Sequence, residues 1–245
     1  MSREKLVVNE IFLSLQGEST YAGLPCVFVR LTGCDLRCSY CDTAYAFSEG
    51  EQLSIDEIVG RVKRLAGHFR GVKSLLRLPI VEVTGGEPLL QRATPALLDR
   101  FCKEGFMVLL ETSGAHDISV TPRGVKRIMD LKCPSSGESE KNRWDNINHL
   151  TPEDEIKFVI GTQEDYEWSK SVILEKNLAD ICPILFSWCE PLSAEQLHRS
   201  LKPFPTEQKR ISRRELAELI IKDGLPVRFQ IQLHKIIWSD VLRGV

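Results

Sequence analysis

Short apolar runs recur along the chain, each four to ten residues long and bounded by glycine, proline or charged residues. Runs of this length that are rich in valine, isoleucine, leucine and phenylalanine predict β-strands. Their apolar character is nearly continuous, which is typical of strands covered by helices on both faces, or of a sheet that curls and fills its inner face. The runs are residues 7–16, 26–34, 79–84, 106–112, 128–133, 155–161, 181–188 and 227–233.

Helix signals separate many of these runs. The spacing of Ser54 and Glu57 predicts a capping box, as does that of Ser212 and Glu215, and Gly224 marks the end of the second helix. Each such cap stabilises a helix by about 1 kcal/mol. Further helices are predicted between Thr94-Pro95 and Gly105, near 163–176 after Thr162, and near 194–201 after Ser193.

Strands that alternate with helices predict right-handed crossovers and a parallel sheet. We count about six parallel strands, fewer than a closed eight-fold barrel requires, since such a barrel typically takes about 250 residues. The predicted fold is therefore a single α/β domain over residues 1–245, built as a partial, open β/α barrel. The stretch 135–154 is dominated by Ser, Glu, Lys, Asn and Asp, and it predicts a long surface loop or lid.

Composition narrows the range of functions. The 32 basic and 34 acidic residues nearly balance, with a formal net charge of −2, which argues against a protein that coats nucleic acid. The first residues lack the apolar run of an export signal, and no window approaches the roughly 18 apolar residues of a membrane span. We therefore expect a cytoplasmic protein without membrane contact, in which clustered cysteines serve as metal ligands or catalysts.

Three of the eight cysteines, Cys34, Cys38 and Cys41, have the spacing C-x3-C-x2-C directly after a predicted strand. A structural zinc site is one interpretation, but such a site is closed by a fourth ligand, which Cys133 or Cys26 would have to supply. An iron–sulfur cube normally takes one thiolate on each iron. Three thiolates on a short loop would leave one iron open to an external ligand.

A pair of glycines follows the apolar run 80–83, in the sequence Thr84-Gly85-Gly86-Glu87-Pro88. By itself such a pair predicts a turn. Two residues without Cβ also let a ligand approach the backbone closely, and the Glu87 carboxylate would then face a cationic amino group. The two interpretations differ in whether a ligand lies at the end of this strand.

The cysteine spacing, the strand-borne Gly-Gly-Glu-Pro and the parallel α/β pattern together resemble the radical S-adenosylmethionine superfamily. In that superfamily the open iron of a 4Fe-4S cluster is chelated by the amino and carboxylate groups of S-adenosylmethionine. One-electron reduction then splits the sulfonium and yields a 5′-deoxyadenosyl radical that abstracts hydrogen from the substrate. The resemblance implies that the cofactor supplies the hard chemistry and that the protein positions it.

More of the chain resembles one family of that superfamily, the 7-carboxy-7-deazaguanine synthases. This resemblance implies conversion of 6-carboxy-5,6,7,8-tetrahydropterin to 7-carboxy-7-deazaguanine with loss of ammonia, a ring contraction on the route to queuosine. It extends from near residue 9 almost to the end of the chain. The matching segments are Leu15-Gln16-Gly17-Glu18, the run Phe-Val-Arg-Leu-Thr-Gly-Cys ending at Cys34, Cys41-Asp42-Thr43, Glu111-Thr112-Ser113-Gly114 and Gln230-Ile231-Gln232-Leu233-His234-Lys235.

Carried over position by position, the resemblance implies three groups of site residues. The cluster would be bound by Cys34, Cys38 and Cys41, and Mg²⁺ by the hard neutral oxygen of Thr43. The substrate would contact Leu15, Gln16, Gly17, Glu18, Arg30, Thr84, His234 and Val245, with the Arg30 guanidinium on the substrate carboxylate. S-adenosylmethionine would contact Gly86, Glu87, Asp130, Leu131, Lys132, Thr162, Gln163, Glu164 and Asp165.

The residues alone leave simpler interpretations open for several of these positions. Arg30 would also fit a surface salt bridge, and Thr43 would fit a hydroxyl that hydrogen-bonds within a turn. The acidic residues after Thr162 would also serve the dipole of the helix that begins there. The chain departs from the family pattern at Ser19, where the family commonly has glycine. The cysteines outside the triad match no ligand and are predicted to be small apolar groups: Cys26, Cys102, Cys133, Cys182 and Cys189.

The resemblance also implies a one-electron reductant, such as flavodoxin or ferredoxin, and a homodimer. Two other functions share part of the sequence pattern. A glycyl-radical-activating enzyme has the same cysteine spacing but needs an open groove for a loop of its protein substrate. A non-catalytic electron carrier ligates every iron with protein side chains. The side chains around the three cysteines should therefore distinguish the three functions.

Overall fold

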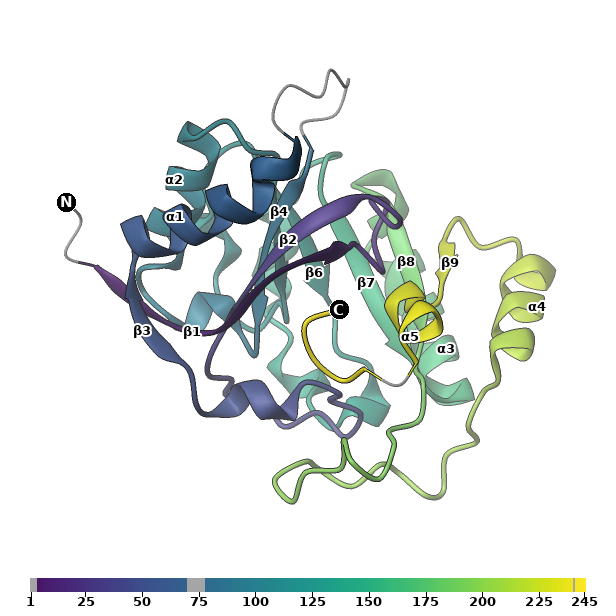
Figure 1. Ribbon diagram of the computed structural model, residues 1–245. Coiled ribbons are helices and arrows are strands. Elements are labelled where there is room, and N and C mark those ends of the chain that lie inside the picture. Colours follow the sequence, from purple (N-terminus) through teal and green to yellow (C-terminus); the bar gives the residue numbers. More distant parts are fainter. Residues whose placement is uncertain (1–3, 70–77, 240) are drawn as a thin grey trace.

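A computed structural model describes residues 4–69, 78–239 and 241–245; residues 1–3, part of the segment considered above for an export signal, lie outside this description. Its strands are β1 (Lys5–Leu15), β2 (Pro25–Leu31), β3 (Glu51–Ser54), β4 (Ile80–Gly85), β5 (Val108–Thr112), β6 (Val125–Asp130), β7 (Glu155–Ile160), β8 (Ile184–Trp188) and β9 (Arg228–Gln230). The strands form one nine-stranded sheet in the order β3-β1-β2-β4-β5-β6-β7-β8-β9 (Figure 1).

The sheet is mostly parallel and unclosed. Strand β2 and the six strands from β4 to β9 run parallel, whereas β1 is antiparallel to both of its neighbours. In the described part of the chain the edge strands β3 and β9 do not pair with each other. The predicted open β/α barrel is thus confirmed, with seven parallel strands where about six are expected from the apolar runs.

Five α-helices accompany the sheet: α1 (Ile55–Leu65), α2 (Thr94–Lys103), α3 (Gln163–Glu175), α4 (Arg213–Asp223) and α5 (Leu233–Ile237) among the described residues. The predicted starts of α1, α3 and α4 are confirmed, because Ser54, Thr162 and Ser212 each accept a hydrogen bond in a complete capping box. The predicted end of α4 is confirmed as well, with Gly224 in the left-handed conformation. None of the described helices is long and apolar enough to cross a membrane.

The predicted helix between Thr94-Pro95 and Gly105 is confirmed as α2, and the Thr94 hydroxyl donates to the carbonyl oxygen of Pro88 at 2.5 Å. One prediction about a helix is wrong. The segment 194–201 forms turns instead of a helix. The side chain of Gln196 accepts from the backbone N–H of Ser193 at 2.9 Å, and such local side-chain bonds compete with helix formation.

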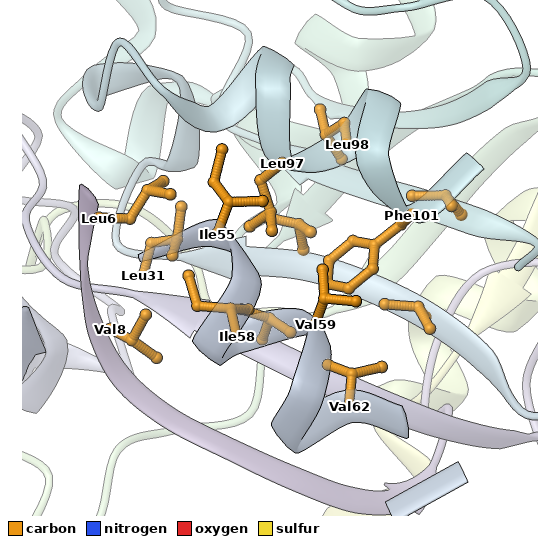
Figure 2. Packing of buried hydrophobic residues seen from close by; sticks show 14 of the residues in the cluster. Leu6, Val8, Leu31, Ile55, Ile58, Val59, Val62, Leu97, Leu98 and Phe101 are labelled. Carbon is orange, nitrogen blue, oxygen red and sulfur yellow. The ribbon is translucent and has the colours of Figure 1, made fainter. Parts of the chain in front are cut away.

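The two faces of the sheet differ in what they bury. Helices α1 and α2 cover one face of the β1–β5 half, and Figure 2 shows Ile58 and Val62 of α1 and Phe101 of α2 converging on that core. Each such buried side chain contributes about 1.5–3 kcal/mol of transfer free energy. The opposite face has an apolar layer at its base, formed by Cys26, Phe28, Ile80, Leu109, Ile128 and Leu185.

Above this base layer the inner face becomes polar. Two positions further along the strands lie Arg30, Glu82, Glu111, Asp130 and Ser187, and Thr84 follows Glu82 on the same face. Since strand side chains alternate between faces, these polar groups stand on the same side as the base layer. The sheet therefore curls and fills the base of its inner face, which is the second of the two arrangements that the apolar runs allow.

The polar stretch 135–154 lies at the surface, with 11 of its 20 residues exposed, while the others pack against the barrel. It contains the short 3₁₀ helices Ser139–Lys141 and Trp144–His149 and follows another, Pro134–Ser136. Its side chains are buried where they bond neighbouring backbone: the Asn146 amide donates to the carbonyl oxygens of Gly114 and His116 at 2.9 and 2.7 Å. The buried polar side chains of this stretch therefore form hydrogen bonds between loops, since buried polar groups need partners.

Candidate active site

A cavity of about 460 Å³ occupies the polar part of the inner face. It lies at the carboxyl ends of the parallel strands, where open α/β sheets bind their ligands. The last residues of the chain, drawn in yellow across this side of the sheet in Figure 1, also line it, and so the predicted Val245 lies at the cavity. A cavity of this size suits a small-molecule substrate rather than a protein loop.

Most of the predicted site residues meet at this cavity. Its lining includes Leu15, Gln16, Gly17, Glu18, Arg30, Cys34, Cys38, Cys41, Thr43, Thr84, Gly86, Asp130, Lys132, His234 and Val245. Six residues predicted to contact S-adenosylmethionine are not in the lining: Glu87, Leu131, Thr162, Gln163, Glu164 and Asp165. The structure gives most of these six another role, as described below.

The three-cysteine loop is held in place by the packed segment that follows β6. The backbone N–H of Ser39 donates to the carbonyl oxygen of Ser136 at 3.0 Å, and its hydroxyl donates to that of Ser135 at 2.6 Å. The backbone N–H of Arg37 donates to the Glu138 carboxylate at 2.7 Å. Cys26 and Cys133, the candidates for a fourth zinc ligand, lie in apolar clusters outside the cavity lining.

The cysteine thiols are protonated in this setting. Burial raises the pKa of Cys34 to about 11 and that of Cys41 to about 12, and it also raises the pKa of Cys38. Lys132, a neighbouring cation, lowers all three pKa values in part. Thiolates are the ligands of iron, so an incoming cluster must displace these protons. All three cysteines line the cavity, and among the described residues no three His, Cys, Asp or Glu side chains are already arranged to hold a metal.

The glycine pair at the end of β4 is required by packing. A Cβ on Gly86 would lie 2.7 Å from the Cβ of Cys34, so only glycine lets β4 approach the cysteine loop this closely. Glu87 is fully buried, and its carboxylate accepts from the Ser113 backbone and hydroxyl at 2.7 and 2.6 Å and from the Thr112 hydroxyl at 2.9 Å. The carboxylate of Glu87 therefore ties β4 to β5, and the contact of this residue with S-adenosylmethionine stays a prediction.

Asp130 and Lys132 both face the cavity, whereas Leu131 between them packs into the core on the other side, as strand alternation requires. Lys132 Nζ donates to Asp130 Oδ2 at 2.7 Å. Asp130 Oδ1 is buried and has no hydrogen-bond partner among the described residues. A carboxylate oxygen of this kind fits a ligand that donates a hydrogen bond, such as a ribose hydroxyl or an ammonium group.

The residues at the start of α3 serve the fold. The Asp165 carboxylate is fully buried and accepts from the backbone N–H groups of Gly161 and Ser135 at 2.9 and 2.8 Å. Thr162 completes the capping box, and Gln163 and Glu164 point to solvent. These contacts follow the simpler interpretation, that of a helix start. Through Ser135, Asp165 also supports the segment on which the cysteine loop rests.

Arg30 lies on β2 with its side chain largely buried at the cavity. Its Nε donates to Glu10 at 2.7 Å, and the Tyr45 hydroxyl donates to the same carboxylate oxygen at 2.8 Å. Burial by itself would lower the pKa of Arg30, but Tyr45 and Glu10 raise it, so the guanidinium stays charged. Arg30 does form a salt bridge, but the pair is half-buried at the cavity and not on the open surface.

The loop after β1 and the C-terminal segment meet across the cavity. The Gly17 carbonyl accepts from the Leu233 backbone N–H at 2.9 Å, and the Gln232 amide donates to Glu18 at 2.8 Å. A Cβ on Gly17 would collide with the ring of His234, so this glycine allows the close approach.

Ser19, the departure from the family pattern, has a φ of +63°. A left-handed backbone favours glycine, which explains why glycine is common at this position. Ser19 holds the conformation through two hydrogen bonds with Gln230, one of them from the Gln230 amide to the Ser19 carbonyl at 2.7 Å.

Glu82 and Lys157 are charged residues of the cavity that the sequence alone does not predict. Each stands alone within an apolar strand segment, Ile80-Val81-Glu82-Val83 and Ile156-Lys157-Phe158. Lys157 Nζ binds Glu18 at 3.1 Å and makes a short ion pair with Glu111. Burial alone would lower the pKa of Lys157, but the two carboxylates raise it well above its usual value. An isolated charge in an apolar strand is the signal that could have found both residues.

Known proteins resemble the chain closely. A sequence model of the Radical SAM superfamily matches residues 28–175. The 7-carboxy-7-deazaguanine synthases of Koribacter versatilis and Chlorobaculum tepidum are 40% and 42% identical to it, over 97% and 98% of this chain and 99% and 97% of theirs. The chain belongs to the 7-carboxy-7-deazaguanine synthase family.

The solved structures agree with this family in fold. QueE from Escherichia coli superposes with a TM-score of 0.68 at 21% identity, covering 94% of this chain and 95% of that one. Streptococcus suis SuiB bound to its precursor peptide SuiA has a TM-score of 0.58 at 16% identity, over 87% of this chain and 50% of that one. Membership of the superfamily implies a 4Fe-4S cluster and S-adenosylmethionine as cofactors. Neither the activating enzyme nor the electron carrier is favoured by the comparisons.

Proposed function

We propose that the chain converts 6-carboxy-5,6,7,8-tetrahydropterin to 7-carboxy-7-deazaguanine with loss of ammonia, in line with the name of its relatives. The supporting observation is that the cysteine loop and the residues expected to hold a carboxylated pterin line one cavity. When bound to Cys34, Cys38 and Cys41, the cluster together with S-adenosylmethionine supplies radical chemistry that activates a C–H bond of the substrate.

The chain's own groups bind and orient this substrate. The Arg30 guanidinium, fixed at Nε by Glu10, has further N–H groups for the planar substrate carboxylate. Gln16 lies in the substrate loop and Thr84 on the neighbouring strand, and both present polar groups to the cavity. The C-terminal segment covers the cavity and excludes water from the reacting ring.

The proposal is tested by anaerobic reconstitution with iron and sulfide, followed by incubation with reductant, S-adenosylmethionine and 6-carboxytetrahydropterin. Mass spectrometry should detect 7-carboxy-7-deazaguanine and an equal amount of ammonia. Cleavage of S-adenosylmethionine without any product from the pterin would contradict the proposed substrate. The reductant, which we infer to be flavodoxin or ferredoxin, is identified by comparing rates with each carrier against a chemical reductant. The homodimer stays a prediction, to be checked by sedimentation.

Arg30→Ala should raise the KM for the pterin at least about 30-fold, because truncating one member of a buried charge pair costs about 2–5 kcal/mol. Steady-state kinetics over a range of pterin concentrations measures the effect. Arg61→Ala is the matched control, since Arg61 pairs with Glu51 on the helix-covered side and does not line the cavity. An unchanged KM in Arg30→Ala would remove Arg30 from the substrate site.

We also infer that Thr43 binds Mg²⁺. Its hydroxyl faces the cavity and donates to Asp42 at 2.8 Å, and oxygen ligands of this kind suit a cation that keeps several waters. Thr43→Ala should therefore lose most of the stimulation of activity by Mg²⁺, and Thr43→Ser should retain it. The measurement is the rate as a function of Mg²⁺ concentration. Equal stimulation of the wild type and Thr43→Ala would rule this ligand out.

A further inference from the structure

Glu82 is a carboxyl group within an apolar layer. In the parallel register of the sheet it lies beside Phe28 of β2 and Leu109 of β5, two members of the base layer of the inner face. Only 1% of Glu82 is exposed, yet it lines the cavity. A leucine would fill this position without the cost of burying a polar group. The carboxyl group therefore needs an explanation other than packing.

Glu82 holds Gln16 in one orientation. The Gln16 amide nitrogen donates to Glu82 Oε2, and the Gln16 amide oxygen accepts from the Glu18 backbone N–H at 2.9 Å. Both ends of the amide are thus assigned by their partners. Gln16 is itself 96% buried, so this pair forms a fixed polar patch beside the apolar base layer.

The nearby cations are bound to other carboxylates. Lys157 pairs with Glu18 and Glu111, and Arg30 pairs with Glu10. Burial raises the pKa of Glu82 well above its usual value, and the Glu111 carboxylate raises it further. Lys157 and Arg30 lower this pKa in part, and the net shift favours the neutral carboxylic acid, which has one O–H donor besides its acceptor oxygen.

We propose that Glu82 is a substrate-positioning residue whose neutral carboxyl group, together with the Gln16 amide, binds the heterocycle edge that carries a carbonyl beside an N–H. This inference rests on the proposed function and adds a recognition residue to the same site. A carboxylate would only accept hydrogen bonds, whereas the acid and the amide supply donors and acceptors side by side. Thr84, two residues further along the same strand face, continues this polar surface toward the substrate carboxylate at Arg30.

The test compares Glu82→Gln with Glu82→Leu in the reconstituted holoenzyme. Gln keeps a neutral donor and acceptor, so its KM for the pterin should stay within about threefold of the wild type. Leu leaves the Gln16 amide unpaired and removes the donor, so its KM should rise at least about tenfold, with a smaller change in kcat. Glu82→Leu should keep its cluster, its affinity for S-adenosylmethionine and a cooperative unfolding transition, because leucine suits the apolar layer.

The inference would be overturned if Glu82→Leu had the wild-type KM for the pterin, or if the KM rose equally in both variants. Difference infrared spectra of the wild type and Glu82→Gln give a second readout that does not depend on the leucine variant. The wild type should show the carbonyl band of a protonated carboxylic acid that is absent from Glu82→Gln and shifts when the pterin binds. A missing or unmoved band contradicts this inference alone, whereas failure of the wild type to convert the pterin contradicts the proposed function.

Discussion

Replacement of Cys38 by alanine is expected to give a folded protein that holds no 4Fe-4S cluster and has no synthase activity. With Cys34 and Cys41 alone, the cluster would lose one of its three protein ligands. The loop itself should survive, because its backbone is held through Ser39 and Arg37 and not through the sulfur. Removing one buried sulfur costs on the order of 1 kcal/mol, well below the about 5–15 kcal/mol that stabilise a domain.

Iron and sulfide content and visible absorption after anaerobic reconstitution measure the loss of the cluster, and circular dichroism measures the fold. Cys102→Ala is the matched control. Cys102 lies on α2 and packs against the core on the helix-covered face, outside the cavity lining. It should keep the cluster and the activity of the wild type. A brown chromophore retained at full strength by Cys38→Ala would contradict the assignment of this ligand.

The parallel sheet could be predicted because burial by helices leaves a local mark. Strands such as β4 and β7 appear as compact apolar runs between turns. The antiparallel direction of β1 leaves no such mark, since it depends on pairing with β2 through a connection whose direction the residues do not encode locally. Strand β3 was not predicted because it has only four residues, two of them exposed, and is stabilised by pairing with β1. Tertiary pairing outweighs local propensity in both cases.

The same difference between local and long-range information applies to the candidate site. Cys34, Cys38 and Cys41 are close in sequence, so their spacing carries the information. The contacts of Glu82 with Gln16 and of Lys157 with Glu18 join residues 66 and 139 positions apart. Only the sheet register and the path of the loop after β1 bring these groups together. The structural contacts of Glu87 and Asp165 could not be predicted, because a buried carboxylate that ties loops together has the same sequence signal as one that faces a ligand.

Lys157→Met should destabilise the protein by about 3–5 kcal/mol, the usual cost of leaving a buried carboxylate without its partner. Lys157 is 96% buried, and the substitution would leave Glu18 and Glu111 facing each other without a cation. Urea unfolding at neutral pH measures the loss as a lower midpoint. Lys126→Met on β6 is the matched control, because its pair with Glu153 is exposed to solvent and should contribute under about 1 kcal/mol.

The deficit of Lys157→Met should shrink as the pH falls. In the wild type, burial raises the pKa of Glu18 but Lys157 and His234 lower it below its usual value, so Glu18 stabilises the fold above that value and less so in acid. In the variant, protonation removes the unpaired charges and restores part of the lost stability. Adding Glu111→Gln to Lys157→Met should recover stability at neutral pH for the same reason. A deficit that is independent of pH and unaffected by the second substitution would mean that Lys157 stabilises the fold by packing and not by charge.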